Sequence, residues 1–413
     1  MTSRDKRQEL CVSNWIINKC KGLIIAKTGF GKTRIAMIAI KKFLKKNLSG
    51  NIMIVVPNEA LERQWKNLLL ENGIIAEVVI INTVIRHNWK TDFLILDEIH
   101  MMASELNIDV FNRVKYKMVL DLTATIKRLD GREELILEHC PIVDEVTSEE
   151  CLENNWISEH KEYKVLIDVN LDDYNDANKH FLGFFSFFNY DFNLAMKCVT
   201  NFRYREILAK GLTNRSSDFQ ESLKIVNANS FGFLKALKFR KKFVQEHPKK
   251  IELANLIIEH RMDKKIITFS STIKMAEKIK YGNSLNSGMT KKKRSITLDE
   301  FKSVKTGVLN SSKALNAGVD IEYLNTAIIL TNSSSNIEKK QRVGRVIRLE
   351  GSDKIAEVFT FVIKGTMEES WFSKSTGNDA HITIDEENLL RLLKGEPYEE
   401  LRNVSKTNPI LRF

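Results

Sequence analysis

The stretch Gly22-Leu-Ile-Ile-Ala-Lys-Thr-Gly-Phe-Gly-Lys-Thr33 joins an apolar run to a loop that contains two glycines. An apolar-periodic segment, Arg34 to Leu44, follows at once and is typical of a helix. A strand, such a loop and a helix in this order predict a phosphate-binding loop, because backbone N–H groups and the helix N-terminus both attract phosphate. Ala26 stands where the common pattern has its first glycine.

The residues of this loop are candidate contacts to a nucleotide. Lys32 can reach the β- and γ-phosphate oxygens, and the Thr33 hydroxyl can bind Mg²⁺. Glycines at positions 29 and 31 let the backbone close around the phosphates. We therefore expect ATP and Mg²⁺ as cofactors, with ATP contacts at Lys27, Thr28, Gly29, Phe30, Gly31, Lys32, Thr33 and Arg34.

An acidic tetrapeptide, Asp97-Glu-Ile-His100, follows the apolar run Phe93 to Leu96. Asp97 can bind Mg²⁺, and Glu98 can orient and deprotonate a water that attacks the γ-phosphate. Taken alone, this tetrapeptide is equally compatible with a solvated acidic turn. Together with the phosphate-binding loop it predicts ATP hydrolysis, with Lys32, Asp97 and Glu98 as catalytic residues.

Two series of short apolar runs alternate with helical patterns. This rhythm predicts two α/β domains with parallel sheets, at residues 1–158 and 159–413. Residues 172–248 lack strand patterns and predict a helical insertion near the start of the second domain, and residues 365–413 predict a helical tail. The expected strands lie at 22–26, 52–56, 78–81, 93–96, 117–122, 161–169, 265–269, 306–310, 325–330 and 357–363.

Composition limits the class of protein. The 413 residues carry 64 Lys and Arg against 53 Asp and Glu, and a net charge of +11 favours polyanionic partners such as nucleic acid. The five cysteines form no CxxC pair, so the sequence indicates neither a disulfide framework nor a zinc site. No apolar run is long enough to span a membrane, and the N-terminus does not resemble a signal peptide. We expect an intracellular, cytoplasmic protein that does not enter membranes.

Further segments resemble, in order and spacing, the signature motifs of superfamily 2 helicases and translocases, the class that includes the DEAD/DEAH-like enzymes. The resemblance covers most of the chain, and its most specific part is Gln341-Arg-Val-Gly-Arg-Val-Ile-Arg348. The matching segments are 55–57 (motif Ia), 82–83 (motif Ib), 123–125 (motif III), 267–270 (motif IV), 311–320 (motif V) and 341–348 (motif VI).

The resemblance implies two RecA-like domains in tandem, with ATP bound between them. Arg345 and Arg348, one helical turn apart, would reach the γ-phosphate from the second domain, so hydrolysis would depend on domain closure. Gln8 lies where the family has a glutamine that contacts adenine, although an exposed glutamine near the N-terminus is an equal alternative. The other implied residues contact nucleotide (Gly318, Asp320), nucleic acid (Pro57, Thr83, Ser270, Ser311) or couple the two (His100, Thr123, Thr125, Gln341, Arg342).

Within this superfamily, the forms Asp-Glu-x-His, Leu315-Asn-Ala-Gly-Val-Asp320 and Gln-Arg-x-Gly-Arg look most like the Rad25/XPB and phage UvsW group. That resemblance implies a phage-type, ATP-dependent DNA helicase or translocase, located in the host cytoplasm if a phage encodes it. It would unwind or branch-migrate forked or branched DNA in recombination, repair or replication.

Three alternatives to this function stay open: an RNA helicase or transcript-release factor, a duplex translocase that does not unwind, and a catalytically inactive scaffold. The scaffold is disfavoured because the catalytic residue types are present.

The helical insertion is a candidate for additional nucleic-acid contacts. Relatives of the Rad25/XPB group usually carry a DNA-binding module ahead of the first motor domain, whereas the phosphate-binding loop here begins by residue 26. Phenylalanines at helical spacing indicate either the core of the insertion or rings that stack on bases. The residues concerned are Phe181, Phe184, Phe185, Phe188 and Phe192, and the basic cluster beside them is Lys235, Lys238, Arg240, Lys241 and Lys242.

Overall fold

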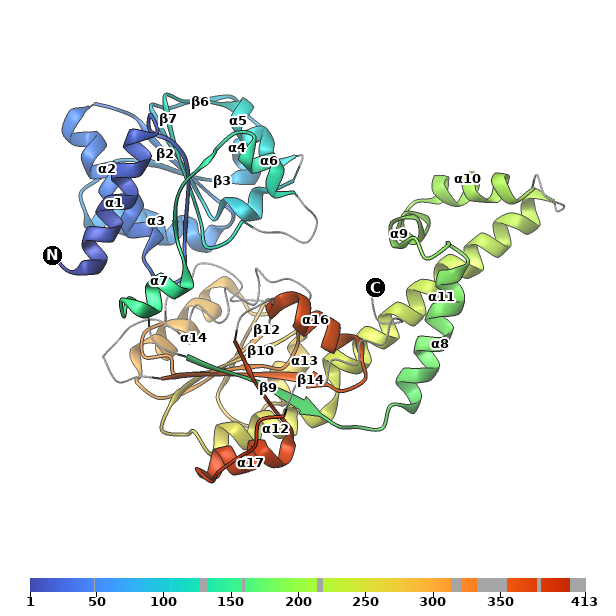
Figure 1. Cartoon of the computed structure of the whole chain (residues 1–413). Helices are drawn as coiled ribbons and strands as arrows, with labels where there is room; N and C mark the ends of the chain where they lie inside the picture. The colour runs from blue at the N-terminus through green and yellow to red at the C-terminus, as the bar shows by residue number, and fades with distance from the viewer. Residues whose placement is uncertain are drawn as a thin grey trace.

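Two parallel sheets, each with helices on its faces, make up the body of the protein, and a helical arm extends from the second sheet (Figure 1). The computed structural model describes residues 1–47, 49–104, 106–126, 132–157, 160–213, 218–312, 321–332, 355–376 and 380–401. The predicted architecture of two α/β domains in tandem with a helical insertion is confirmed.

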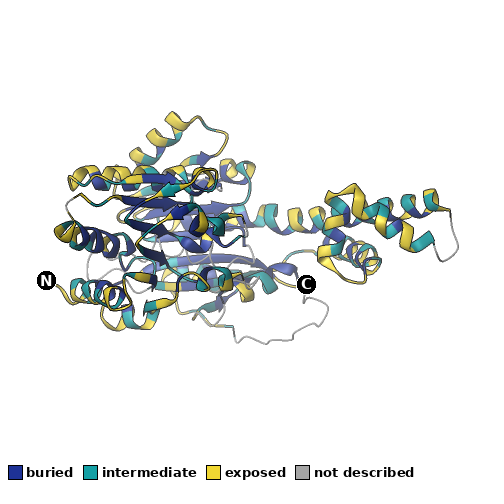
Figure 2. Cartoon of the chain, turned by 90° about the horizontal axis from the view of Figure 1, so that it is seen from above, coloured by how far each residue is buried: buried dark blue, intermediate teal, exposed yellow. Residues whose placement is uncertain are grey.

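The first sheet has the strand order β3-β2-β5-β7-β1-β8, and all neighbouring strands are parallel. Its central strands are buried almost throughout because helices cover both faces, as Figure 2 shows by the dark strands between paler helices. The strands are β1 (Lys21–Ala26), β2 (Ile52–Val56), β3 (Glu77–Ile80), β5 (Phe93–Asp97), β7 (Met118–Thr123) and β8 (Ile142–Val146); β4 (Trp89–Lys90) and β6 (Val114–Lys115) pair separately.

The helices of the first domain begin with α1, in which Thr2 and Asp5 form a reciprocal capping box. Among the described residues, no helix of the protein is both long and apolar enough to cross a membrane. The first-domain helices are α1 (Ser3–Ile17), α2 (Lys32–Lys46), α3 (Glu59–Glu71), α4 (Ile81–Val84), α5 (Val110–Arg113), α6 (Glu133–Leu137) and α7 (Ser148–Glu153), with 3₁₀ turns at Ile99–Met102 and Asn107–Asp109.

The second sheet has the order β11-β12-β10-β13-β14-β9-β15 and is also parallel. Its strands are β9 (His160–Ile167), β10 (Lys265–Ser270), β11 (Asn283–Asn286), β12 (Gly307–Ser312), β13 (Thr326–Ile329), β14 (Ala356–Ile363) and β15 (Ile382–Ile384). Its helices are α12 (Pro248–Glu259), α13 (Ile273–Lys278), α14 (Lys291–Ser303), α16 (Met367–Thr376) and α17 (Glu386–Lys394).

A fully buried ion pair joins two of these helices. The Lys250 Nζ of α12 lies 2.6 and 2.8 Å from the two carboxylate oxygens of Glu368 on α16. Glu368 also accepts a hydrogen bond from the backbone N–H of Ile363 at 3.0 Å. Several hydrogen bonds thus compensate the desolvation of both charges, which is the condition under which such a pair is tolerated in a core.

The arm consists of α8 (Asp172–Ser186), α9 (Phe192–Thr200), α10 (Phe202–Thr213) and α11 (Phe219–Glu246). Phe181, Phe185 and Phe188 are buried against Phe233 of α11 and form the arm's own core. Of the two interpretations of the phenylalanine pattern, the core is therefore correct for these rings. The helical spacing of the phenylalanines predicts that all five share one helix face. This is wrong for Phe192, because α8 ends at Ser186 and positive φ angles at Asn189 and Tyr190 turn the chain into α9.

Both ends of the arm are fixed in the second domain. The Tyr174 hydroxyl near the start of α8 accepts a hydrogen bond from the backbone N–H of Met367 at 2.9 Å. Val244, in the last turn of α11, is buried in the core of the second sheet. The part between these two positions projects beyond that core (Figures 1 and 2).

Asp121 places a carboxyl group in the middle of the first sheet. It lies on β7, level with Leu23 of β1 and Leu96 of β5, and is fully buried. Neither carboxylate oxygen has a hydrogen-bond partner of the usual geometry within the described ranges, although the Cys140 thiol faces them. Burial raises the pKa of Asp121 from 3.8 to about 7. The contribution of Asp121 to the free energy of unfolding is therefore fully present below about pH 4, where the carboxyl is neutral in both states. This contribution is lost as the pH rises through 7.

We predict that Asp121→Asn makes the protein more stable relative to wild type as the pH rises, because asparagine resembles the neutral acid. Between pH 5 and pH 8 the difference in unfolding free energy should change by about 2–3 kcal/mol in favour of the variant. Urea unfolding at both pH values measures this difference. Asp263→Asn, at an exposed carboxylate, is the control. A difference that does not vary with pH would contradict the prediction.

Candidate functional site

The phosphate-binding loop joins β1 to α2, and its shape depends on two left-handed glycines. Gly29 and Gly31 have φ angles of 93° and 104°. Gly31 is also the N-cap of α2. A Cβ atom at Gly31 would lie 2.7 Å from the Gln8 amide nitrogen, so both backbone conformation and space require glycine there.

Helix α1 fixes the tip of this loop. Gln8 Nε2 donates to the Phe30 carbonyl at 2.7 Å, and Arg4 Nε donates to the same oxygen at 3.0 Å. Arg4 Nη2 also donates to the Gly29 carbonyl. Gln8 is buried beside the loop, so the alternative of an exposed glutamine is excluded. Gln8 Oε1 is buried and accepts no hydrogen bond from a described residue, which leaves an acceptor for a ligand N–H group.

The acidic pair lies at the carboxyl end of β5. Asp97 is buried, and its Oδ2 accepts a hydrogen bond from Trp65 Nε1 on α3 at 2.9 Å. Glu98 has a φ of 55°, a left-handed conformation that carries strain for a residue with a side chain. Burial, and then the charge of Glu98, raise the pKa of Asp97 to about 6. A divalent cation beside Asp97 would oppose both effects by favouring the ionised carboxylate.

Polar contacts connect the phosphate-binding loop to the sheet through Glu98. Lys32 Nζ lies 3.3 Å from Glu98 Oε1, and the other oxygen, Oε2, lies 3.3 Å from His100 Nδ1. The same ring nitrogen lies 2.8 Å from Thr123 Oγ1, and this hydroxyl donates to the Thr125 carbonyl at 2.7 Å. The structure therefore brings together five residues that the sequence analysis assigned to hydrolysis and coupling.

The remaining loop residues lie at the same edge of the first sheet. Lys27, Thr28 and Thr33 are half-buried there, and the Lys27 backbone N–H donates to the Val146 carbonyl of β8 at 3.3 Å. Arg34 is largely exposed and forms an ion pair with Asp5 of α1 at 2.8 Å. In this structure Arg34 is thus directed at α1, and its contact with nucleotide stays a prediction.

The four residues predicted to contact nucleic acid fall into two groups. Pro57 follows β2 and is half-buried, and Thr83 is exposed on α4. Ser270 is the last residue of β10, and Ser311 lies in the neighbouring strand β12 of the second sheet. Both are buried. The Ser270 hydroxyl donates to the Thr272 carbonyl at 3.1 Å, so these two serines would need local movement to reach a ligand.

A contact between the two domains lies beside Pro57. Lys291, the first residue of α14, forms an ion pair of 2.7 Å with Glu59 at the start of α3. The hydrogen bond from Lys291, and then the positive charge of Lys291, lower the pKa of Glu59. Both partners are exposed, so the pair contributes little to stability. Six further predicted residues lie outside the described residues: Gly318, Asp320, Gln341, Arg342, Arg345 and Arg348.

Sequence reasoning missed two tryptophans that contact the site. Trp65 donates to Asp97, and Trp156 packs against Phe30 with ring centroids 5.3 Å apart. Neither belongs to a recognisable motif, and each lies far from its partner in sequence. An apolar-periodic pattern in α3 indicates that Trp65 is buried, but it does not identify the residue beneath it.

Comparisons with known proteins place the chain in a family. Residues 3–87 match the family described as type III restriction enzyme, res subunit, and residues 248–350 match the helicase conserved C-terminal domain. The DNA 3′-5′ translocase XPB2 of Sulfurisphaera tokodaii is 27% identical over 394 residues, covering 88% of this chain and 82% of that protein. The chain belongs to the superfamily 2 helicases. The predicted family, its XPB-like relation and a nucleic-acid-dependent ATPase activity are confirmed.

Other relatives of this helicase match over shorter stretches or in fold alone. A protein of African swine fever virus, named as an ATP-dependent RNA helicase, is 32% identical over 140 residues, 26% of its length. The Hef helicase domain of Pyrococcus furiosus has a TM-score of 0.50 at 16% identity, covering 89% of this chain and 97% of that one. Dbp5 of S. cerevisiae, bound to RNA and ADP BeF3, has a TM-score of 0.57 at 14% identity, covering 94% and 92%.

We predict that Glu98→Gln retains nucleotide binding but lowers the turnover of ATP by about 10²-fold or more, because the amide cannot accept a proton from water. Lys32→Ala should weaken nucleotide binding itself, because it removes the positive charge predicted to reach the β- and γ-phosphates. Steady-state ATP hydrolysis and binding of a fluorescent ATP analogue separate the two effects. Glu77→Gln, at the exposed start of β3, is the control. Near-normal turnover in Glu98→Gln would show that Glu98 does not accept the proton of the attacking water.

Proposed function

We propose that this helicase is an ATP-driven motor on DNA, and that it unwinds or branch-migrates forked or branched DNA in recombination, repair or replication. The observation that carries the choice of DNA is the likeness to a protein named as a DNA 3′-5′ translocase, which extends over 82% of that protein's length. The relatives named as RNA helicases match over 20–26% of theirs.

The residues around the phosphate-binding loop fit ATP. The free Gln8 Oε1 suits the amino group of adenine, and the loop with Lys32 suits the phosphates. Thr33 and Asp97 would hold Mg²⁺, which when bound neutralises charge on the β- and γ-phosphate oxygens. Lys32 would then leave Glu98 for the phosphates. This exchange would free the Glu98 carboxylate to accept a proton from the attacking water.

Coupling to the second domain would use the remaining predicted residues. Arg345 and Arg348 would complete the site from that domain, with Gln341, Arg342, Gly318 and Asp320 beside them. His100, Thr123 and Thr125 would pass a change at Glu98 to the end of β7. Contacts to the nucleic-acid backbone would come from Pro57, Thr83, Ser270 and Ser311. The nucleic acid would then lie between the two sheets.

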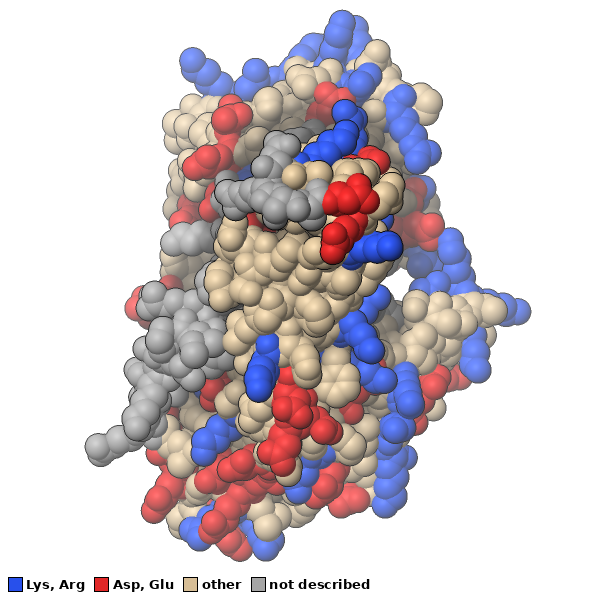
Figure 3. All heavy atoms as spheres, turned by 90° about the vertical axis from the view of Figure 1, so that its right-hand side faces the viewer, with Lys and Arg blue, Asp and Glu red and all other residues tan. Residues whose placement is uncertain are grey.

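The arm offers a second contact surface for DNA, the lysine face of α11. Lys224, Lys235, Lys238 and Lys242 are exposed, and their spacing places them on one side of the helix over about 27 Å. Phe231 is half-exposed on the same side. Figure 3 shows Lys and Arg side chains running down one side of the view that faces the arm. Lysines for phosphates beside an exposed ring suit a nucleic-acid strand.

The structure corrects the sequence-based interpretation of one residue of the basic cluster. Arg240 is buried, with its guanidinium 4.1 Å from the centroid of the Phe181 ring, so it supports the arm's core instead of a ligand. Lys242 also lines a cavity of about 440 Å³ at the base of the arm, together with Lys274 and Lys278 of α13. Because α13 follows β10, whose end carries Ser270, the lysine face continues towards a predicted backbone contact.

We predict that DNA stimulates ATP hydrolysis on the order of tenfold, and that forks and four-way junctions stimulate it most. Steady-state rates are measured with no nucleic acid, single-stranded DNA, duplex DNA, a four-way junction and RNA at one salt concentration. Stronger stimulation by RNA would favour the second candidate, an RNA-directed motor. The similarity to the viral protein named as an RNA helicase supports this candidate. Stimulation by duplex without strand displacement would favour a translocase that does not unwind.

We predict that Lys235→Gln/Lys238→Gln weakens DNA binding and makes its dependence on salt shallower. Each lost phosphate contact should reduce the slope of log K against log salt by roughly 0.9. Fluorescence anisotropy across a salt series measures this slope. Lys45→Gln/Lys46→Gln, at the exposed end of α2, removes the same charge elsewhere and should leave the slope as in wild type. Equal salt slopes in the two double variants would show that the lysine face of α11 does not contact DNA.

A further inference from the structure

Trp156 lies in the connection between the two sheets and contacts the phosphate-binding loop. This connection leaves the first sheet at Val146, forms α7 and enters the second sheet at His160. The Trp156 ring packs at 51° to the ring of Phe30, the loop's tip residue, and both side chains are buried. Trp156 Nε1 donates to Ser3 Oγ of α1 at 2.9 Å. One side chain thus contacts both the loop and the helix that holds it.

The local sequence explains why the chain turns back onto the loop at this point. The Thr147 hydroxyl caps α7 by accepting from the Glu150 backbone N–H at 3.1 Å. Asn155 takes a left-handed conformation, with φ of 53°, directly after the helix. The Trp156 backbone N–H then donates to the Cys151 carbonyl at 2.8 Å, which closes the C-terminal turn. This turn directs the indole at Phe30 instead of into solvent.

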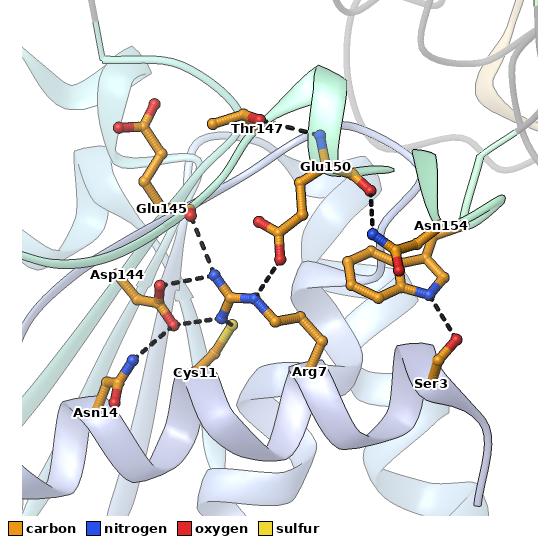
Figure 4. A network of polar contacts seen from close by, with 10 residues as sticks. Ser3, Arg7, Cys11, Asn14, Asp144, Glu145, Thr147, Glu150 and Asn154 are labelled. Carbon is orange, nitrogen blue, oxygen red and sulfur yellow. Dashed lines mark hydrogen bonds and ion pairs between the residues drawn. The ribbon is translucent and has the colours of Figure 1, made fainter. Parts of the chain in front are cut away.

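Arg7 joins α1 to the same connection (Figure 4). Its guanidinium forms two hydrogen bonds of 2.7 and 2.9 Å with Asp144 of β8, and its Nε donates to Glu150 of α7 at 2.6 Å. It also donates to the Glu145 carbonyl at 3.1 Å. Burial alone would raise the pKa of Asp144, but the hydrogen bonds and charge of Arg7 outweigh it and hold that pKa below its usual value. Such a bidentate, charge-assisted contact makes α1, β8 and α7 one unit.

We propose that Trp156 is a positioning residue that couples the state of the phosphate-binding loop to the second domain. The proposal rests on the proposed function, since it takes the loop as the site of ATP. Gln8 and Arg4 hold the Phe30 carbonyl, and Gln8 is the predicted contact to adenine. A nucleotide that draws them away shifts Phe30 against Trp156. Because Arg7 keeps α1 and α7 together, that shift acts on the segment of the connection that carries Trp156 and precedes β9 in the chain.

Another tryptophan of the first domain provides a matched control. Trp15 is also buried, donates from Nε1 to the Val119 carbonyl at 2.8 Å and stacks on Phe93 at 5.2 Å. It lies near the other end of α1, away from the loop. Replacing either indole with phenylalanine removes one indole N–H and a similar volume, so Trp15→Phe reproduces the structural cost of Trp156→Phe without the contact to Phe30.

The test compares wild type, Trp15→Phe, Trp156→Phe and Trp156→Leu. ADP should change the intrinsic tryptophan emission of wild type and Trp15→Phe, and this change should be clearly smaller in Trp156→Phe. In Trp156→Leu the DNA-stimulated kcat should fall about fivefold or more while the KM for ATP changes by less than about twofold. Trp156→Phe should recover most of that kcat, because it restores a ring against Phe30.

Two results would overturn the proposal. One is DNA stimulation in Trp156→Leu equal to that of wild type. The other is an ADP-induced emission change that persists undiminished in Trp156→Phe. If no nucleic acid stimulates wild-type ATPase, the proposed function fails instead, and the emission change still decides whether Trp156 reports on the loop. Thermal midpoints that match between Trp156→Phe and Trp15→Phe establish that lost folding does not cause the effects.

Discussion

The carbonyl of Phe30 is the group on which the geometry of the nucleotide site depends. It lies between two glycines with positive φ, in a loop that has no regular secondary structure to satisfy its backbone. The hydrogen bonds from Gln8 and Arg4 supply that satisfaction, and an unpaired buried carbonyl would cost about 1–3 kcal/mol. The loop can therefore keep its shape only while α1 stays in place. This requirement explains why α1 is joined to β8 and α7 through Arg7.

Much of the fold could be predicted because most strands are buried on both faces. Strands β1, β2 and β5 are apolar almost throughout, and β10 is buried along its whole length. Each of the four begins and ends within two residues of its predicted limits. Within the two large sheets, three strands escaped prediction for physical reasons. β8 contains Asp144 and Glu145 at the sheet edge, β11 reads Asn-Ser-Leu-Asn, and β15 has three residues. Polar or very short strands carry no periodic signal, and their pairing is decided by neighbours that are distant in sequence.

The site was predictable where its chemistry is local in sequence. Lys32, Asp97 and Glu98 belong to compact motifs, and the ion pair between Lys32 and Glu98 brings two of them together as expected. Contacts made across the fold were not predictable. Trp65 meets Asp97 from another helix, and Trp156 meets Phe30 from a segment more than a hundred residues further along. The sequence around each tryptophan does not indicate which residue the tryptophan contacts, because the contact exists only once the sheet has formed.

The length of α11 has a mechanical consequence for the arm. Its 28 residues form one uninterrupted helix of about 42 Å, and its last turn is buried in the second domain through Val244. Tyr174 fixes the antiparallel partner α8 at the same end. The arm therefore turns with the second sheet as a rigid rod turns with its pivot. A rotation of that sheet by roughly 10° displaces the tip of α11 by about 7 Å, which is far more than any atom near the pivot moves.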